Sequence, residues 1–340
     1  MVLAALVGAA CVVTPLVISQ SAVTAPSSGL PIFRYEKTSG GPLPWNATSL
    51  VAQMANTAMA GSPRITPFED VAFLTWRSVD GHAMSLRLGT SSPQTTDLTA
   101  LTGLPTIVDD PWFGIDSLDN QHVIGTDANG HVQLASVLST PPYLDAKLPG
   151  RRSATLTVQR DLTGESGVSF ASAPDYVMQN DVVRIVGRTT SNHLVVLFVD
   201  VSWRASAPFV VDVTNLAHDT GISGTPIWMP SGKAIAANAP NGSLFFYQLP
   251  DGCTGTTLTC SSVASTNITS ATGAPLLTSV LSATTTSTGV ALVGLSASGA
   301  AIVITGTPVG ASWNWVDVNI TTPSGAPALS GRPILASVGS

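Results

Sequence analysis

Three histidines stand at matching points of the sequence and have the composition of a metal site. His82, His131 and His193 each follow a turn residue and open an apolar run. One metal ion needs its ligands within about 2 Å. The three segments that carry these histidines are successive copies of one repeat, so each histidine belongs to a different structural unit. We therefore predict no metal site, and no other pattern in the sequence predicts a cofactor.

The densest acidic segment is DDPWFGIDSLDN, residues 109–120, with carboxylates at Asp109, Asp110, Asp116 and Asp119. Loops of this kind can bind calcium. Their spacing here differs from the twelve-residue calcium loop, so an ordinary solvated loop with Asp-type turns is favoured.

Catalytic motifs are weak. The sequence contains no Gly-x-Ser-x-Gly elbow and no His-Glu-x-x-His motif. A carboxylate pair contributed by loops, as a glycosidase needs, stays open as an alternative.

Aromatic and arginine side chains fall in the longer, uneven segments between the apolar runs. Side chains of these types anchor interfaces and stack on sugars. We predict that they contact a ligand, with inward packing over the core as the alternative for each residue. The predicted contacts are Trp112, Tyr143, Tyr176, Trp203, Arg204 and Trp228.

Short sequence repeats indicate which elements position these residues. A turn residue of type Gly or Asn recurs about every fifty to sixty residues, between two apolar runs. Gly and Asn accept the positive φ angle that a tight hairpin needs. The turn residues are Gly29, Gly81, Gly130, Asn192, Gly242 and Gly299.

Each hairpin is followed by a third run and then, in most repeats, by a Gly-x-Pro signal. Residues 71–76, 193–199 and 208–216 are examples of the first, second and third runs. The signal occurs at Gly61, Gly103, Gly224, Gly273 and Gly325, and the third repeat alone lacks it. We expect a fourth strand after the signal. We also expect the run before each turn to be the innermost strand, because small residues such as Gly125 and Gly187 recur there.

Repeats of four short antiparallel strands predict an all-β fold, a β-propeller of six four-stranded blades. Residues 23–340 would form this single domain. The C-terminal run RPILASVGS, residues 332–340, would complete the blade that the N-terminus begins, which protects the sheet edges. The alternative is that residues 21–26 form the inner strand of the first blade and that residues 332–340 begin a seventh blade.

The hairpins in VDGHAMSLRL, ANGHVQLAS and TSNHLVVLF resemble the repeat of secreted bacterial β-propeller proteins, across residues 23–340. More loosely, the layout is similar to six-bladed sugar-binding lectins, whose sites between blades reuse an arginine, an acid and a tryptophan. Arg77 and Arg188 occupy matching positions in two repeats, but the full set does not recur. The resemblance therefore does not imply a multivalent lectin.

Composition restricts the partners and the compartment. The chain has 340 residues, of which only 10% are charged, and its net charge is −6 without a basic run. Nucleic-acid binding, which needs a phosphate-neutralising surface, is therefore excluded. Residues 1–22 have the apolar character of a signal peptide or leader, too interrupted for a confident membrane span. Export agrees with a predicted disulfide between Cys253 and Cys260.

The function predicted from these features is a secreted or cell-surface binding protein that recognises a glycan or an extracellular protein through its loop-rich face. We expect binding rather than catalysis. Two alternatives stay open: a propeller glycoside hydrolase or lyase acting on an extracellular polysaccharide, and a structural fragment of a larger surface protein.

Overall fold

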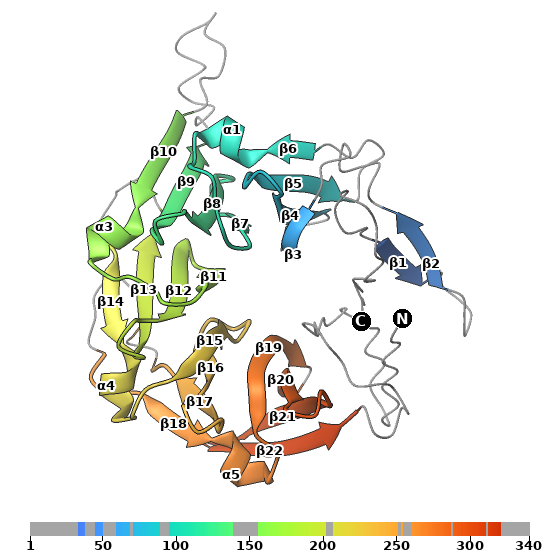
Figure 1. The fold of residues 1–340 in the computed structure, drawn as a ribbon, viewed down its shortest axis with the longest axis vertical. Coiled ribbons are helices and arrows are strands. Elements are labelled where there is room, and N and C mark those ends of the chain that lie inside the picture. The colour runs from blue at the N-terminus through green and yellow to red at the C-terminus, as the bar shows by residue number, and fades with distance from the viewer. Residues whose placement is uncertain are drawn as a thin grey trace, which may run out of the picture.

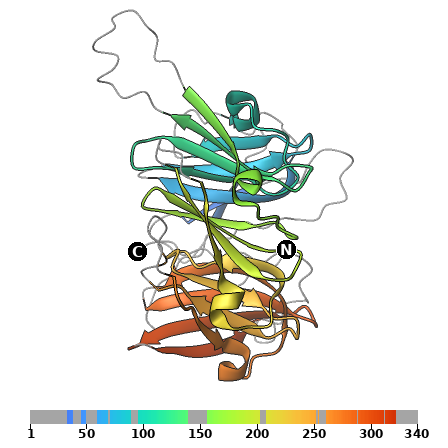
Figure 2. The same ribbon diagram turned by 90° about the vertical axis from the view of Figure 1, so that its left-hand side faces the viewer.

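The protein forms a ring of antiparallel sheets around an open centre (Figure 1). The computed structural model describes residues 33–37, 45–49, 59–68, 71–88, 95–138, 156–201, 207–250, 253, 260–286, 288–310 and 312–320. Within these residues there are five four-stranded sheets and one two-stranded sheet. Seen from the side, the strands run between the two faces of the ring (Figure 2).

Every four-stranded sheet uses its strands in sequence order from the centre outward. The first sheet has β3 (Met59–Phe68), β4 (Val71–Ser78), β5 (Ala83–Leu88) and β6 (Thr95–Asp97). The second has β7 (Trp112–Ile115), β8 (Gln121–Thr126), β9 (Val132–Leu138) and β10 (Leu156–Asp161). The third has β11 (Asp175–Gln179), β12 (Val182–Arg188), β13 (Leu194–Asp200) and β14 (Phe209–Asp212).

The fourth sheet has β15 (Ser223–Trp228), β16 (Ala234–Asn238), β17 (Leu244–Gln248) and β18 (Ala264–Asn267). The fifth has β19 (Leu277–Thr286), β20 (Gly289–Ser296), β21 (Ala301–Val309) and β22 (Ser312–Asn319). The two-stranded sheet pairs β1 (Phe33–Lys37) with β2 (Trp45–Ser49). The all-β, propeller-like architecture is therefore confirmed, but six four-stranded blades are not, because the described residues form five. Residues 21–26 and 332–340 lie outside the described residues.

The predicted order of strands within a blade was wrong by one position. The run before each hairpin turn is the second strand, and the segment after the helical turn, such as β7, is the innermost strand of the next sheet. The glycines of the second strand have a different cause from the one expected. A Cβ on Gly125 would lie 2.7 Å from Ile107 Cγ2, and one on Gly187 would lie 2.3 Å from the Phe170 ring.

The hairpin turns have the predicted backbone conformation. Gly81, Gly130, Asn192, Gly242 and Gly299 all adopt a positive φ, between 64° and 85°. Gly29 lies outside the described residues.

A one-turn helix follows the outer strand in four sheets, where the sequence predicted only a loop signal. The helices are α1 (Leu98–Thr102), α3 (Leu162–Ser166), α4 (Val213–Ala217) and α5 (Ile268–Thr272). An Asp or Asn caps each helix and a left-handed residue ends it. These left-handed residues are Gly103, Gly167, His218 and Gly273. The third repeat lacks Gly-x-Pro, as predicted, but Gly167 fills the same left-handed place at the end of its helix. The fourth has His218 in that place, and Gly224 belongs to β15.

Each capping residue begins a three-residue motif, Asp/Asn-apolar-Thr, that ties the helix to the hairpin. The threonine hydroxyl accepts a hydrogen bond from the backbone of the third strand, as from Val132 N to Thr163 Oγ1 at 2.9 Å. The same bond links Ala83 with Thr99, Leu194 with Thr214, and Leu244 with Thr269.

Replacing the buried Thr163 by alanine should lower the free energy of unfolding by about 1–3 kcal/mol, because the Val132 N–H loses its partner. Urea denaturation measures this loss. Thr163→Ser, which keeps the hydroxyl, is the control, and an equal loss in both variants would contradict the assignment.

The core consists of apolar layers between neighbouring sheets rather than one central cluster. Phe113 and Leu98 lie between the first and second sheets, and Ile124 and Ile185 between the second and third. Phe198 packs with Trp228 and Tyr247 between the third and fourth sheets, and Phe246 packs with Trp315 between the fourth and fifth.

The predicted disulfide between Cys253 and Cys260 is confirmed. No helix in the described part of the chain has the length and apolar character to cross a membrane.

Candidate functional site at the centre of the ring

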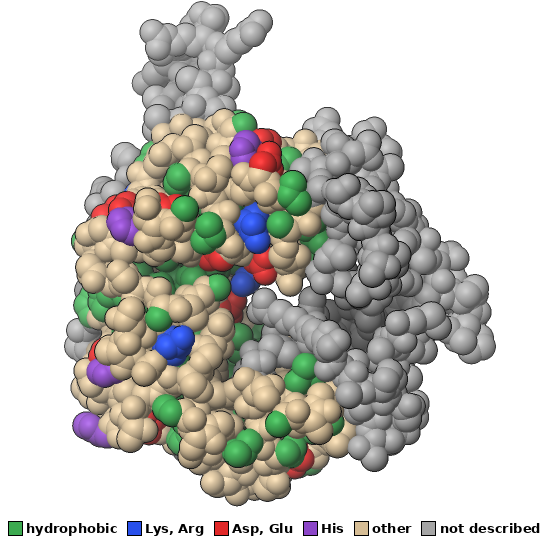
Figure 3. Space-filling model, viewed as in Figure 1, with side chains coloured by type: hydrophobic (Ala, Val, Ile, Leu, Met, Phe, Trp, Pro, Cys, Tyr) green, Lys and Arg blue, Asp and Glu red, His purple; other side chains and the backbone are tan. Residues whose placement is uncertain are grey.

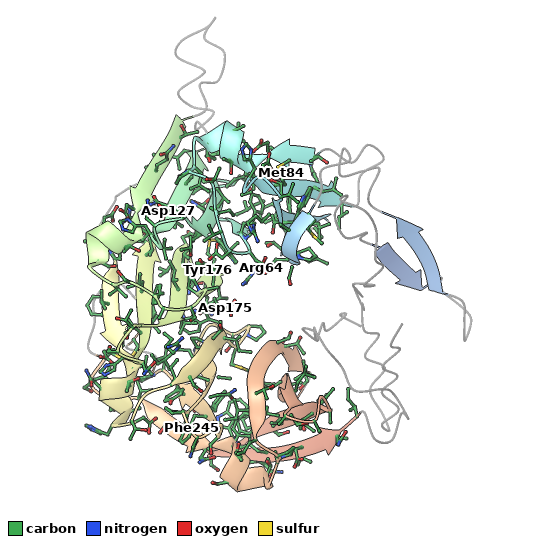
Figure 4. The ribbon with its side chains drawn as sticks, viewed as in Figure 1. Arg64, Met84, Asp127, Asp175, Tyr176 and Phe245 are labelled. Carbon is green, nitrogen blue, oxygen red and sulfur yellow. A yellow bond between two sulfur atoms is a disulfide. The ribbon has the colours of Figure 1, made fainter. Side chains whose placement is uncertain are left out.

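An ion pair bridges two sheets that are not neighbours. Arg64 on β3 donates from Nη1 to Asp175 Oδ1 on β11 at 2.8 Å, past the sheet that lies between them. Figure 4 shows both side chains near the centre of the ring. The Arg64 guanidinium also lies over the ring of Tyr176, 5.7 Å from its centroid.

Asp175 connects this pair to a third sheet. Its Oδ2 accepts a hydrogen bond from the backbone N–H of Trp228 on β15 at 2.8 Å. Burial lowers the pKa of Arg64, but the charge of Asp175 and its hydrogen bond outweigh burial, so the net shift is upward. Arg64 is therefore fully charged.

Two further carboxylates, Asp109 and Asp110, precede β7 close to this pair. Asp109 accepts hydrogen bonds from Thr126 N at 2.8 Å and Thr126 Oγ1 at 2.6 Å. Asp110 accepts one from Ser62 N at 2.9 Å. Gly61 adopts a φ of +88°, and a Cβ there would lie 2.0 Å from Asp110 Oδ1, so only glycine leaves room for this carboxylate.

Burial raises the pKa of Asp109, although the hydrogen bonds from Thr126 and the charge of Arg64 oppose the shift. Burial also raises the pKa of Tyr176 well above its ordinary value, so its hydroxyl stays neutral. We call Arg64, Asp109, Asp110, Asp175 and Tyr176 the axial cluster. In Figure 3, blue and red side chains gather around the central hollow, on a face that is otherwise mostly uncharged.

Three of the six predicted ligand contacts lie elsewhere than expected. Trp112, Tyr176 and Trp228 belong to innermost strands and are 8%, 5% and 4% exposed. Their predicted placement in the connecting segments is therefore wrong, and all three pack inward, which was the alternative for each. Tyr176 and Trp228 both contribute to the surroundings of the axial ion pair. Tyr143, Trp203 and Arg204 lie outside the described residues.

The acidic segment 109–120 is not the solvated loop that its composition favoured. It contains the start of the axial cluster, the strand β7 and a tight turn around a buried Asp116. Asp116 accepts hydrogen bonds from the backbone of Leu118 and Asn120 and from His122 Nε2 at 3.2 Å. His122 Nδ1 in turn lies 2.8 Å from Ser136 Oγ.

The residues Ser136, His122 and Asp116 have the composition of a catalytic triad but not its accessibility. All three are less than 9% exposed, and His122 is completely buried. Burial lowers the pKa of His122, which favours the neutral ring. A substrate therefore has no access to the serine. The arrangement is a buried polar network that stabilises the second sheet.

The three repeated histidines lie on three different sheets, as predicted. Each Nδ1 pairs with the carboxylate that caps the helix of its own sheet. The pairs are His82 with Asp97 at 2.7 Å, His131 with Asp161 at 2.8 Å, and His193 with Asp212 at 2.7 Å. Each pair therefore holds a helical turn against a hairpin. Asn267 takes the same capping place in the fourth sheet, where its Oδ1 accepts a hydrogen bond from Ser270 N.

One histidine pair should make stability depend on pH. The hydrogen bond to Asp97 raises the pKa of His82 above 6.5. A raised folded-state pKa stabilises the protein fully below the unfolded value and loses this effect as pH rises through the folded value. His82→Gln should therefore destabilise the protein more at about pH 5.5 than at about pH 8. Urea denaturation at both pH values measures the difference. Ser243→Ala, at the matching position of the fourth sheet, should show the same change at both, and an equal change for His82→Gln would refute the prediction.

Comparisons with known proteins give likenesses of fold at low identity. No family model matches this sequence, and no curated protein matches it. A triple mutant of AofleA from Arthrobotrys oligospora is 13% identical with a TM-score of 0.46, covering 77% of this chain and 71% of its own. The Aleuria aurantia lectin in complex with Fucα1-6GlcNAc is 12% identical with a TM-score of 0.45, covering 90% and 91%. An engineered GH43 glycoside hydrolase is 13% identical with a TM-score of 0.40, covering 82% and 56%. Likenesses at this level do not assign the chain to a family.

Proposed function

We propose that this protein is an extracellular glycan-binding β-propeller whose axial cluster holds the ligand. The observation that carries the proposal is the ion pair between Arg64 and Asp175, set over the ring of Tyr176 at the centre of the ring. Sugar hydroxyls both donate and accept hydrogen bonds, so a carboxylate and a guanidinium fixed side by side suit them. Tyr176, which is 5% exposed, lies under the guanidinium and supports the pair rather than contacting the ligand. Tyr143, Trp203 and Arg204 remain proposed contacts from the connecting segments.

The disulfide between Cys253 and Cys260 supports an extracellular location, because such bonds persist in oxidising compartments. A glycan-array screen of the protein without residues 1–22 tests the proposal. We expect retention of at least one class of glycan by the wild type and its loss in Arg64→Met. Binding of a protein partner without binding of any glycan would mean that the ligand is a protein rather than a glycan.

A hydrolase is the second candidate, and one observation favours it. Burial raises the pKa of Asp109, whereas Asp175 accepts from a guanidinium and a backbone N–H. A carboxyl group with a raised pKa is what the general acid of glycosidic-bond cleavage needs. Release of reducing ends from a polysaccharide that the protein binds, abolished in Asp109→Asn, would support this candidate. Binding without release supports the non-enzymatic function.

We also propose that β1 and β2 belong to a sixth blade, which residues 332–340 complete. In Figure 1 these strands stand in the arc between the first and the fifth sheets. Closing the ring would protect the edges of its end sheets. Deleting residues 332–340 should lower Tm by about 5 °C or more, measured by thermal denaturation. Deleting residues 1–22 is the matched control and should leave Tm unchanged, and an unchanged Tm in both would contradict the closure.

A further inference from the structure

Two tryptophans on β22 form a stacked pair at the boundary between the fourth and fifth sheets. The rings of Trp313 and Trp315 are 5.6 Å apart at an interplanar angle of 23°. Both meet Phe246 of β17 edge-on, at 5.1 Å and 5.0 Å. Trp315 is buried over Gly306, where a Cβ would lie 2.4 Å from its ring. Trp315 therefore belongs to the core, and Trp313 is the partly exposed outer ring of the stack.

A polar side chain stands beside the outer ring. Trp313 Nε1 donates to Gln248 Oε1 at 3.3 Å, and Gln248 is exposed at the end of β17. The carboxamide oxygen faces the indole, and the carboxamide nitrogen carries two N–H donors. Trp313 and Gln248 lie at the strand ends opposite the hairpin turns at Gly242 and Gly299, on the face from which the segments joining third and outer strands emerge.

We propose that Trp313 and Gln248 form a binding shelf for one ring of a neutral polysaccharide. The C–H face of a pyranose packs on an indole, and an adjacent carboxamide exchanges hydrogen bonds with its hydroxyls. The contacts of Trp313 with Phe246, Trp315 and Gln248 are all uncharged, so the shelf suits a neutral sugar. The stack on Trp315 fixes the ring in advance, which lowers the entropic cost of binding. This shelf is separate from the axial cluster and does not depend on it.

Affinity gel electrophoresis against hydroxyethyl cellulose, xylan and galactomannan tests the shelf, followed by calorimetry with a hexasaccharide of the polysaccharide that binds. We expect at least one polysaccharide to retard the wild type. Trp313→Ala should weaken binding by about tenfold or more, and Gln248→Ala by about threefold. Phe209→Ala, which removes an exposed aromatic ring from β14, is the matched control and should bind like the wild type.

Three outcomes would overturn the shelf: no retardation of the wild type, unchanged affinity in Trp313→Ala, or binding of a decaproline peptide in place of the polysaccharides. If Trp313→Ala fails to fold, the affinity of Gln248→Ala decides the question in the same way. Arg64→Met separates the two sites. Binding lost with Arg64→Met but kept with Trp313→Ala would overturn the shelf and leave the proposed axial function standing. The reverse pattern would support the shelf against the axial site.

Discussion

Replacing Trp76 by alanine is expected to lower the free energy of unfolding by about 3–5 kcal/mol, the cost of emptying a large buried aromatic site. Trp76 on β4 is fully buried among Met59, Leu74, Met84 and Leu86. This loss is the largest that we expect from a single substitution in the described residues.

The expected loss reflects the position of Trp76 in the repeat, which corresponds to a glycine in the next two sheets. Gly125 and Gly187, at the matching positions of β8 and β12, leave room for Ile107 and Phe170, which pack over them from the preceding connections. In the first sheet the matching position of β4 carries Trp76, whose large side chain is itself fully buried. Its removal therefore leaves a cavity close to the start of the ring.

Urea denaturation of Trp76→Ala measures the loss. Trp76→Phe, which keeps part of the volume, should lose less. Val79→Ala, at a 65% exposed turn position of the same sheet, should change stability by less than about 0.5 kcal/mol. A loss for Trp76→Ala no larger than that for Val79→Ala would show that the site is not a packed core.

Replacing Asp175 by alanine is the second large effect, with an expected loss of about 3 kcal/mol and loss of glycan binding. Two partners lose their acceptor at once: Arg64, which keeps a charge in a partly buried place, and the N–H of Trp228. Breaking a buried ion pair by removing one partner costs about 3–5 kcal/mol. The lower end applies here because both side chains keep some contact with water.

A double-mutant cycle separates the pair from its surroundings. Arg64→Met with Asp175→Ala should cost less than the sum of the two single changes, because the double variant leaves no charge without a partner. Asp175→Asn keeps an acceptor for the Trp228 N–H, and should therefore lose less stability than Asp175→Ala. Additive losses around the cycle would mean that the two side chains do not interact.

The sequence predicted the architecture because its strongest signals are local. Turn residues such as Gly81 and Gly130 need a positive φ, and the apolar runs beside them form the second and third strands. The innermost strand was misassigned because spacing alone does not show that it pairs with the strand after it, as β7 pairs with β8, rather than with the blade before it. The motif Asp/Asn-apolar-Thr was present in the sequence at Asp97, Asp161, Asp212 and Asn267. Its role depends on a hydrogen bond to a different strand, which spacing alone does not reveal.

The axial cluster could not be predicted for the same physical reason. Arg64 and Asp175 come from different sheets, and only the curvature of the ring brings them together. Asp109 and Asp110 were noticed as acidic residues, but composition favours a solvated loop for such a segment. Tyr176 was selected for its residue type, and its partner Arg64 was not selected at all. One signal was noted but not used for alignment: a proline just before, or inside, the inner strand of four sheets, at Pro63, Pro111, Pro174 and Pro226. Aligning the sheets on this proline gives Arg64 and Asp175 the same position in the repeat.

The most direct test of the central claim is a calorimetric titration of the folded protein with the glycan that an array selects, repeated for Arg64→Met and Asp175→Ala. A site at the centre of the ring predicts saturable binding by the wild type and an affinity at least about tenfold lower in each variant. Wild-type affinity in both variants, with each of them folded, would place the ligand elsewhere and contradict the axial site.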